Sequence, residues 1–341
     1  MSQHTDHGHQ HDATPRSEYD AGHGPRADGI HAHQGHTTHS RQQRTRHGGH
    51  SATTRGHHHD NTEFDWDVMG PTLEQNAELS SPQYEEAARW IAGLPTAPKV
   101  RRVLDIGSGP GVISCLLAQV FPEAEVVAVD GTPALLERAR ARAQRLGLGD
   151  RVRTRQAELP ADLAGLGEAD LIWAGNALHH MGDQRAALSG FAGLLRAGGT
   201  IALVEGGLPP RQLPRDIGMG RPGLEARLDA ITAEWFEDMR VSLPGSTRET
   251  EDWSALFTAV GLDPQGTRSF LLDLPAPLSG PALDHVVAEF GRRREMFGEA
   301  LSAEDIAVLD RLLDPEDPAG LRHRPDVFLL MARTVHLGRK G

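Results

Sequence analysis

A short apolar segment that runs directly into three alternating glycines constrains the fold of this chain more than any other feature. Residues 103–111 read Val-Leu-Asp-Ile-Gly-Ser-Gly-Pro-Gly, and a helix-like segment beginning Val112-Ile113 follows them. Glycine allows a positive φ and lets a ligand lie against the main chain, and the N-terminus of the following helix attracts an anionic group. This pattern predicts a site for a nucleoside derivative at the end of a strand.

A carboxylate stands at a suitable distance from this loop. Asp130 ends the apolar run 127–129 and lies 19 residues beyond Gly111, where an acidic side chain can accept hydrogen bonds from both ribose hydroxyls of a bound nucleotide. The dinucleotide fingerprint G-x-G-x-x-G requires glycine at position 112, where this chain has Val112. The glycine spacing is G-x-G-x-G instead. An acid at the position of Asp130 also occurs in dinucleotide-binding proteins, so it does not separate a dinucleotide from another nucleoside cofactor.

Apolar segments and helical patterns alternate on both sides of the loop. The strand candidates are 102–106, 125–129, 152–155, 170–173 and 200–205, and the helical segments between them are 111–121, 133–146 and 185–195. This βαβα order predicts a parallel sheet covered by helices on both faces. We therefore expect an α/β fold with a Rossmann-like, doubly wound sheet.

The flanking segments predict additions to this sheet. Residues 82–94 have apolar side chains at helical spacing, and Ser80 or Ser81 is available to cap that helix. Beyond Gly206 the pattern predicts helices near 223–240, 250–260, 281–297 and 303–313, and strands near 269–274 and 326–335. The two late strands are expected to form an antiparallel hairpin that closes the sheet.

The first 60 residues differ in composition from the rest of the chain. They contain 14 of the 19 histidines and no Leu, Val, Phe or Trp, so they have almost nothing to bury. We expect a disordered, His-rich tail. Histidine pairs such as His31 and His33 can capture a metal adventitiously, but a flexible tail offers no fixed coordination geometry.

Charge and cysteine content exclude several classes of protein. The formal net charge is −12, which disfavours generic attraction to nucleic acid or an anionic membrane. The single cysteine, Cys115, excludes an internal disulfide framework and fits a reducing compartment. With no apolar signal-peptide region and 33 Arg against 2 Lys, we expect a cytoplasmic protein from a bacterium with a high-GC genome.

Later motifs at neighbouring strand ends complete a recognisable set. Ala157-Glu158-Leu159 follows the third strand candidate, residues 177–180 (Ala-Leu-His-His) follow the fourth, and Ala197-Gly198-Gly199 precedes the fifth. With the glycine loop and Asp130, these motifs make residues 100–207 resemble the class I S-adenosylmethionine-dependent methyltransferases. The resemblance implies S-adenosylmethionine as cofactor and methyl transfer as reaction, and it leaves the acceptor open.

The resemblance also assigns cofactor-binding residues. It makes Asp105 the acid just before the loop, Asp130 the ribose acid and Glu158 the acid beside the adenine. The segment after the fourth strand contributes Asn176. The loop itself contributes Gly107, Ser108, Gly109 and Gly111. All these residues are expected at the carboxyl ends of parallel strands, where open α/β sheets bind ligands.

Methyl transfer from a sulfonium needs few catalytic groups, because the methyl group is already activated. His179 and His180 are the imidazoles of the strand-end loops, and a neutral imidazole can deprotonate an acceptor near pH 7. Such a pair recurs in methyltransferases with unrelated acceptors, which favours a packing or loop-capping role for both. For the case that one of them is the base, we favour His180 over His179, because it lies nearer the start of the next helix. Glu205 either orients an acceptor group or caps the turn at Gly206-Gly207.

Two motifs that the sequence lacks narrow the range of possible methyl acceptors. Residues 174–177 (Ala-Gly-Asn-Ala) lack the Asn-Pro-Pro-aromatic arrangement of methyltransferases that act on nucleobase amino groups. No acidic pair of the kind that holds Mg in catechol methyltransferases follows the fourth strand, so we expect no catalytic metal. The first hypothesis is therefore methyl transfer to an oxygen or nitrogen of a small molecule, in the context of bacterial secondary metabolism.

These observations divide the chain as follows: a disordered tail (1–61), a helical cap (62–98), the S-adenosylmethionine-binding core (99–207), a helical lid (208–247), and the completion of the sheet (248–341) with a helical insertion around 281–315. The apolar stripe of Leu228, Ile231 and Trp235 either packs in a core or lines the acceptor pocket. Met296 and Phe297 are candidates for a homodimer contact or for more of the lid.

Two other functions remain open on the sequence. A nicotinamide-dependent oxidoreductase uses a similar glycine loop and ribose acid. A cofactor-binding protein with a metal-handling His-rich tail is the non-enzymatic alternative.

Overall fold

The computed structural model describes residues 66–94 and 99–341. The disordered tail expected at 1–61 lies outside these residues. Within them, no helix is both long enough and apolar enough to cross a membrane.

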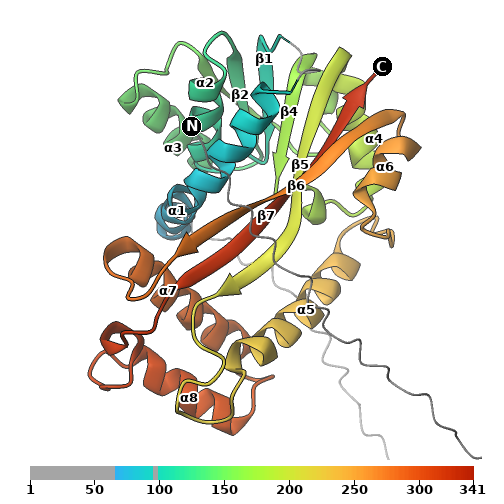
Figure 1. Cartoon of the computed structure of the whole chain (residues 1–341). Coiled ribbons are helices and arrows are strands. Elements are labelled where there is room, and N and C mark those ends of the chain that lie inside the picture. The colour runs from blue at the N-terminus through green and yellow to red at the C-terminus, as the bar shows by residue number, and fades with distance from the viewer. Residues whose placement is uncertain (1–65, 95–98) are drawn as a thin grey trace, which may run out of the picture. The chain divides into compact units, whose positions relative to one another are not determined.

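Seven strands form one mixed sheet in the described part of the chain (Figure 1). In spatial order they are β3 (Val152–Gln156), β2 (Glu125–Asp130), β1 (Arg102–Ile106), β4 (Ala169–Gly175), β5 (Leu195–Arg211), β7 (Leu329–Lys340) and β6 (Leu262–Leu274). The first five are parallel, and β7 is antiparallel to both of its neighbours. The expected Rossmann-like sheet with a closing hairpin is confirmed.

Helices cover both faces of this sheet, as the alternating pattern predicts. The helices of the described residues are α1 (Trp66–Ala92), α2 (Val112–Val120), α3 (Pro133–Arg145), α4 (Gln184–Leu194), α5 (Leu224–Ser242), α6 (Trp253–Ala259), α7 (Gly280–Phe297) and α8 (Ala303–Leu313). One apolar core joins the sheet to α1, α2 and α3. A second core joins the other face to α4 and α6.

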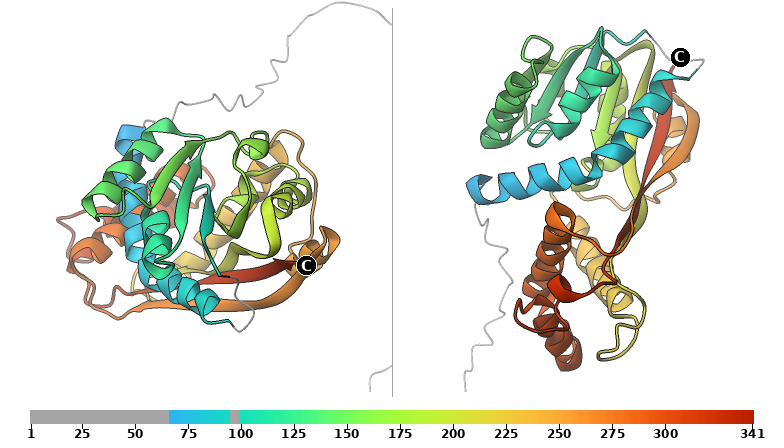
Figure 2. Two further views of the ribbon diagram at one scale, coloured as in Figure 1. Left: turned by 90° about the horizontal axis from the view of Figure 1, so that it is seen from above. Right: turned by 60° about the vertical axis from the view of Figure 1, so that its left-hand side comes forward.

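The first helix is much longer than the expected segment 82–94. It starts at Trp66 and has Pro82 in its interior, and it bends along its length (Figure 2). Ser81 therefore caps no helix start, and its hydroxyl donates to the carbonyl of Ala77 at 2.9 Å within the helix. The N-terminal half is held to α3, where Arg142 donates to Glu74 at 2.7 Å.

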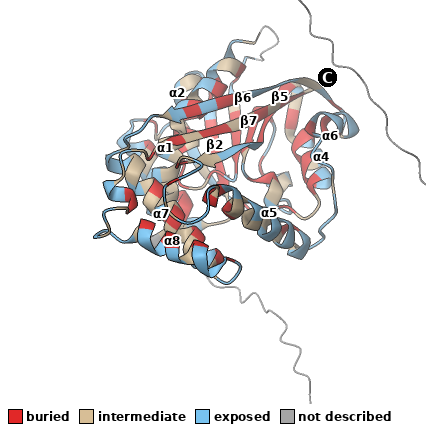
Figure 3. Ribbon diagram, turned by 60° about the horizontal axis from the view of Figure 1, so that its bottom comes forward, coloured by how far each residue is buried: buried red, intermediate tan, exposed pale blue. Residues whose placement is uncertain are grey.

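The long strands β5, β6 and β7 continue past the carboxyl ends of the other parallel strands (Figure 1). At their far ends α5, α7 and α8 pack around an apolar core of their own, which includes Leu228, Val286 and Leu309. The inner faces of these helices are buried and their outer faces are exposed (Figure 3).

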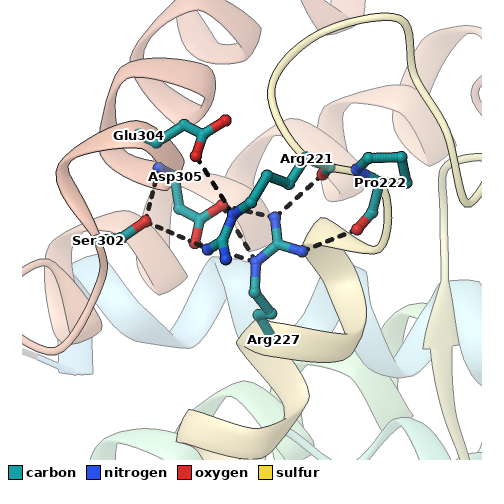
Figure 4. A network of polar contacts seen from close by, with 6 residues as sticks. All are labelled: Arg221, Pro222, Arg227, Ser302, Glu304 and Asp305. Atoms are coloured by element: carbon teal, nitrogen blue, oxygen red, sulfur yellow. Dashed lines mark hydrogen bonds and ion pairs between the residues drawn. The ribbon is translucent and has the colours of Figure 1, made fainter.

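A polar network ties α5 to α8 (Figure 4). Arg227 of α5 donates through Nη2 to Asp305 at 2.6 Å, and also donates to the carbonyl of Pro222 at 2.9 Å. Asp305 is buried, and its own backbone N–H donates to the Ser302 hydroxyl at the start of α8. Pairing with Arg227 keeps the pKa of Asp305 below its usual value. A buried charge is thereby neutralised between the two helices.

Candidate functional site

A cavity of about 620 Å³ lies at the carboxyl ends of β1, β2, β3 and β4. The loops that follow these four strands form its floor, and α1 forms one of its walls. Seven of the cofactor-binding residues assigned from the sequence line it: Asp105, Gly107, Ser108, Gly109, Asp130, Glu158 and Asn176. The cavity lies at the sheet edge where ligands bind in open α/β folds.

The three loop glycines meet different constraints. All three have positive φ: 69° at Gly107, 52° at Gly109 and 75° at Gly111. A Cβ on Gly107 would lie 2.9 Å from the Cβ of Ala177, whereas a Cβ on Gly109 would meet nothing within 4 Å. Gly111 does not line the cavity, and a Cβ there would lie 2.5 Å from the Cβ of Ala139. Its place in the structure is the close approach of α2 to α3.

The carboxylate of Asp130 links the ends of β1 and β2. Its Oδ2 accepts a hydrogen bond from the Gly109 N–H at 2.9 Å, and its Oδ1 accepts one from the Thr132 N–H at 2.8 Å. Each oxygen retains a second acceptor position. The carboxylate of Glu158 lies against the next residue, since a Cβ on Gly131 would be 3.1 Å from the Glu158 Oε1.

Two buried polar groups on the cavity floor are incompletely satisfied. Asp105 is 2% exposed and accepts a hydrogen bond from the Ser114 hydroxyl at 2.5 Å. Burial raises its pKa to about 7 against the effect of that hydrogen bond, and the charge of Asp130 raises it further. The Ser108 hydroxyl is buried and has no hydrogen-bond partner within the described ranges. A ligand with cationic and polar groups would complete both.

These carboxyl groups and the Ser108 hydroxyl fit S-adenosylmethionine. The ribose hydroxyls match the free acceptor positions of Asp130, and the methionine ammonium matches the buried Asp105 carboxyl. An open backbone cradle at Gly109 leaves room for close approach of the ligand.

A polar contact joins α1 to the loop after β4. The Asn176 Nδ2 donates to the Tyr84 hydroxyl at 3.2 Å, and Asn176 has a φ of 51°. The Tyr84 ring packs edge-on against Trp173, with centroids 6.2 Å apart. Tyr84 belongs to the helical cap expected from the sequence, whereas the contribution of residues before Pro82, such as Met69 and Leu73, was missed because the helix was expected to start at Pro82.

The histidine pair divides between two environments. His180 lines the cavity, whereas His179 does not. The Nδ1 of His179 lies 2.8 Å from the Oε2 of Glu205, and the two imidazole rings are 4.2 Å apart. Burial lowers the pKa of His180, and the neighbouring His179 and Arg240 lower it further against the opposing effect of Glu205. His180 is thereby favoured in the neutral form that a base requires.

Glu205 and Arg240 hold this segment from behind. Glu205 is 5% exposed, does not line the cavity and accepts a hydrogen bond from the Leu178 N–H at 3.0 Å. Arg240 of α5 donates to the carbonyls of His179 at 2.7 Å and Met181 at 2.6 Å. Glu205 therefore contacts the loop after β4 through Leu178 and His179 and is not part of the cavity lining.

The helical insertions contribute no described residue to the cavity lining. Leu228 and Ile231 belong to the core between α5, α7 and α8, and Trp235 is exposed. The covering element is α1, through residues such as Met69, Leu73 and Tyr84. In the same described ranges, no group of three or more His, Cys, Asp or Glu side chains is arranged to hold a metal ion.

Comparisons with known proteins match the central part of the chain. Residues 104–201 match a family model described as a methyltransferase domain. The trans-aconitate 2-methyltransferase of Methylobacterium radiotolerans is 38% identical over 120 residues, which are 34% of this chain and 42% of that protein. Its namesake from Methylobacterium nodulans is 30% identical over 175 residues, 50% of this chain and 61% of that protein. The chain therefore spans less than two thirds of either relative.

Among solved structures, a putative methyltransferase from Bacillus halodurans C-125 is similar to this chain. The TM-score is 0.45 at 17% sequence identity, and the match covers 75% of this chain and 98% of that chain.

Proposed function

The chain belongs to the class I S-adenosylmethionine-dependent methyltransferases, and from that premise we propose that it transfers a methyl group to an oxygen or nitrogen of a small molecule bound in the 620 Å³ cavity. The observation that carries the proposal is the convergence of the glycine loop, Asp130, Glu158 and His180 on this cavity. S-Adenosylmethionine supplies an activated methyl group, so the protein has mainly to align the acceptor.

The residues of this chain divide the work by position. Asp130 and Glu158, on the loops after β2 and β3, are the groups for the adenosine part of the cofactor. Asp105 and the Ser108 hydroxyl lie under the methionine part, where a buried carboxyl gains a cationic partner. Tyr84, held by Asn176 at 3.2 Å, shapes the wall on the acceptor side. This order follows the strands from β3 to β4.

His180 is the proposed general base. It is the cavity-lining imidazole of the pair, and its lowered pKa favours the neutral form near pH 7. It would remove the proton of a hydroxyl acceptor as the oxygen–methyl bond forms and the sulfur–methyl bond breaks, or the proton of an ammonium acceptor before the nitrogen attacks. Glu205 and Arg240 act on the reaction through the position of the loop.

The relatives suggest the first acceptor to test. Two of them carry the name trans-aconitate 2-methyltransferase, and a carboxylate oxygen needs no base because it is ionised near pH 7. If trans-aconitate is methylated, turnover should be nearly independent of His180. If an alcohol or amine is methylated, turnover should depend on it.

Calorimetric titration with S-adenosylhomocysteine tests the cofactor site. Asp130→Ala should weaken binding at least 10-fold, because the ribose loses an ionised acceptor. Asp150→Ala, at an exposed position before β3, is the matched control and should bind as the wild type does. Unchanged affinity in Asp130→Ala would remove the ribose assignment.

A further inference from the structure

On one face of β7, a single arginine interrupts the apolar run from Leu329 to Leu337. Side chains on a strand alternate between its faces, and Leu329, Met331, Val335 and Leu337 are all buried on the same face. Arg333 occupies the middle of this series. A guanidinium is costly among apolar neighbours unless an anion or hydrogen-bond acceptors accompany it.

Arg333 has no such accompaniment within the described ranges. It lines the cavity, its Nε is buried without a hydrogen-bond partner, and its side chain makes no ion pair. Each of the other described arginines that is not exposed makes a hydrogen bond or an ion pair. The unpaired arginines elsewhere in the described ranges, such as Arg153, are exposed to water.

The strand order places Arg333 away from the cofactor groups. It is paired with Gly207, beyond the end of the parallel part of β5. A Cβ on Gly207 would lie 2.2 Å from the Ala332 carbonyl oxygen, so the glycine lets β7 approach closely. From β1 to β7 there are three strand spacings, or about 14 Å. The guanidinium therefore extends from the acceptor side of the cavity.

Charge in the cavity is separated in the same direction. The acids Asp105, Asp130 and Glu158 belong to β1, β2 and the loop after β3. Among the described residues, Arg333 is the only lysine or arginine that lines the cavity. A cationic cofactor fits the acidic end, and an anionic group fits the opposite end.

We infer that Arg333 is a specificity-determining residue that binds a carboxylate of the methyl acceptor, so that the acceptors of this enzyme are carboxylic acids. The inference rests on the proposed function, because it assumes that the acidic end of the cavity holds the cofactor. Arginine suits the role because its planar guanidinium can donate two parallel hydrogen bonds to a carboxylate. Binding would also satisfy the buried Nε.

The test uses acetate, because this small carboxylate can enter a carboxylate site whatever the shape of the natural methyl acceptor. The full chain, saturated with S-adenosylhomocysteine and labelled with ¹⁵N at the arginine side chains, is titrated with acetate and with the neutral acetamide. The Nε–H signal of Arg333 is assigned by its absence in Arg333→Lys. We expect acetate to shift this signal saturably, with a Kd at least 10-fold lower than that of acetamide.

Affinity for two cofactor analogues separates the acceptor from the cofactor as source of the carboxylate. S-Adenosylhomocysteine carries a carboxylate and 5′-methylthioadenosine does not. Arg333→Met should bind both within threefold of the wild type, and Arg153→Met is the control for loss of an unpaired arginine. Selective loss of S-adenosylhomocysteine affinity, by 10-fold or more, would assign Arg333 to the cofactor and overturn the inference.

The two proposals fail in different ways. If the wild type does not bind S-adenosylhomocysteine, the proposed function is wrong, and the acetate titration of the ligand-free chain still tests Arg333. If it binds the cofactor analogue but acetate and acetamide act alike, the inference about Arg333 is wrong. Should Arg333→Met fail to fold, Arg333→Gln replaces it in the comparison of the two cofactor analogues, with the same outcomes expected.

Discussion

The Oε2 of Glu205 lies 2.8 Å from the Nδ1 of His179, behind the wall of the cavity. Because a carboxylate can only accept, the Nδ1 of His179 is held as the donor of this pair. The Nδ1–H of His179 therefore bonds to Glu205 outside the cavity lining, and the ring of the adjacent His180 lines the cavity. Two neighbouring histidines of one motif thus lie in different environments.

Replacing each histidine by alanine should separate their roles when the acceptor is an alcohol or an amine. His180→Ala should lower kcat by ~10²-fold or more with nearly unchanged cofactor affinity, and raising the pH should restore part of the rate. His179→Ala should lower thermal stability and cofactor affinity together, with no recovery at high pH. Near wild-type kcat in both single variants and in the double variant would retire the base.

Asp105 should make the ligand-free protein less stable as the pH rises. Its pKa is about 7 in the folded chain, above the usual value of 3.8, so between these values the folded state binds more protons than the unfolded state. The free energy of unfolding then decreases with pH across this window. Asp105→Asn should be more stable than the wild type at pH 8 by about 2–4 kcal/mol.

Urea unfolding at pH 5 and pH 8 measures this difference, with Asp150→Asn as the control at an exposed site. The same Asp105→Asn variant should bind S-adenosylhomocysteine at least 10-fold more weakly, because the ammonium of the ligand loses its counter-charge. If the free energies of unfolding of variant and wild type change in parallel with pH, the pKa of the buried Asp105 carboxyl is not raised.

Arg240 should stabilise the loop after β4 from a distance. Its guanidinium donates to the carbonyls of His179, Met181 and Gly182, which would remain buried without a donor in Arg240→Ala. We expect a loss of about 2–4 kcal/mol in the free energy of unfolding and weaker cofactor binding. Arg240→Lys should recover part of both. If Arg240→Ala changes neither, the contact is dispensable.

Gly111 should tolerate no side chain, although it does not line the cavity. Its φ of 75° disfavours other residues, and an added Cβ would lie 2.5 Å from the Cβ of Ala139. Gly111→Ala should cost about 2–4 kcal/mol of stability. The control is Gly193→Ala near the end of α4, where an added Cβ meets nothing within 4 Å and a change within about 1 kcal/mol is expected. Equal unfolding midpoints would refute the packing argument.

The sequence by itself determined the sheet and the strand-end loops that line one side of the cavity. Strand and helix patterns are local in the sequence and can be read from it directly. The glycine loop between Ile106 and Val112 is local too, because glycine itself allows the positive φ values that the loop needs. Asp130 could be placed because the carboxyl ends of parallel strands meet at one edge. The late hairpin could be predicted from local patterns as well, because two apolar strand patterns are separated by helical segments.

Tertiary structure alone decided the rest of the cavity, because its contacts join residues that are distant in the chain. Tyr84 meets Asn176 across 92 positions, and Arg240 reaches the carbonyl of His179 across 61. Ion pairs with Arg142 hold Glu74 and Glu78 of α1 against α3, and helical spacing beyond Pro82 carries no sign of these contacts. Arg333 was indistinguishable in sequence from a surface arginine until β7 paired with β5 and faced it into the cavity.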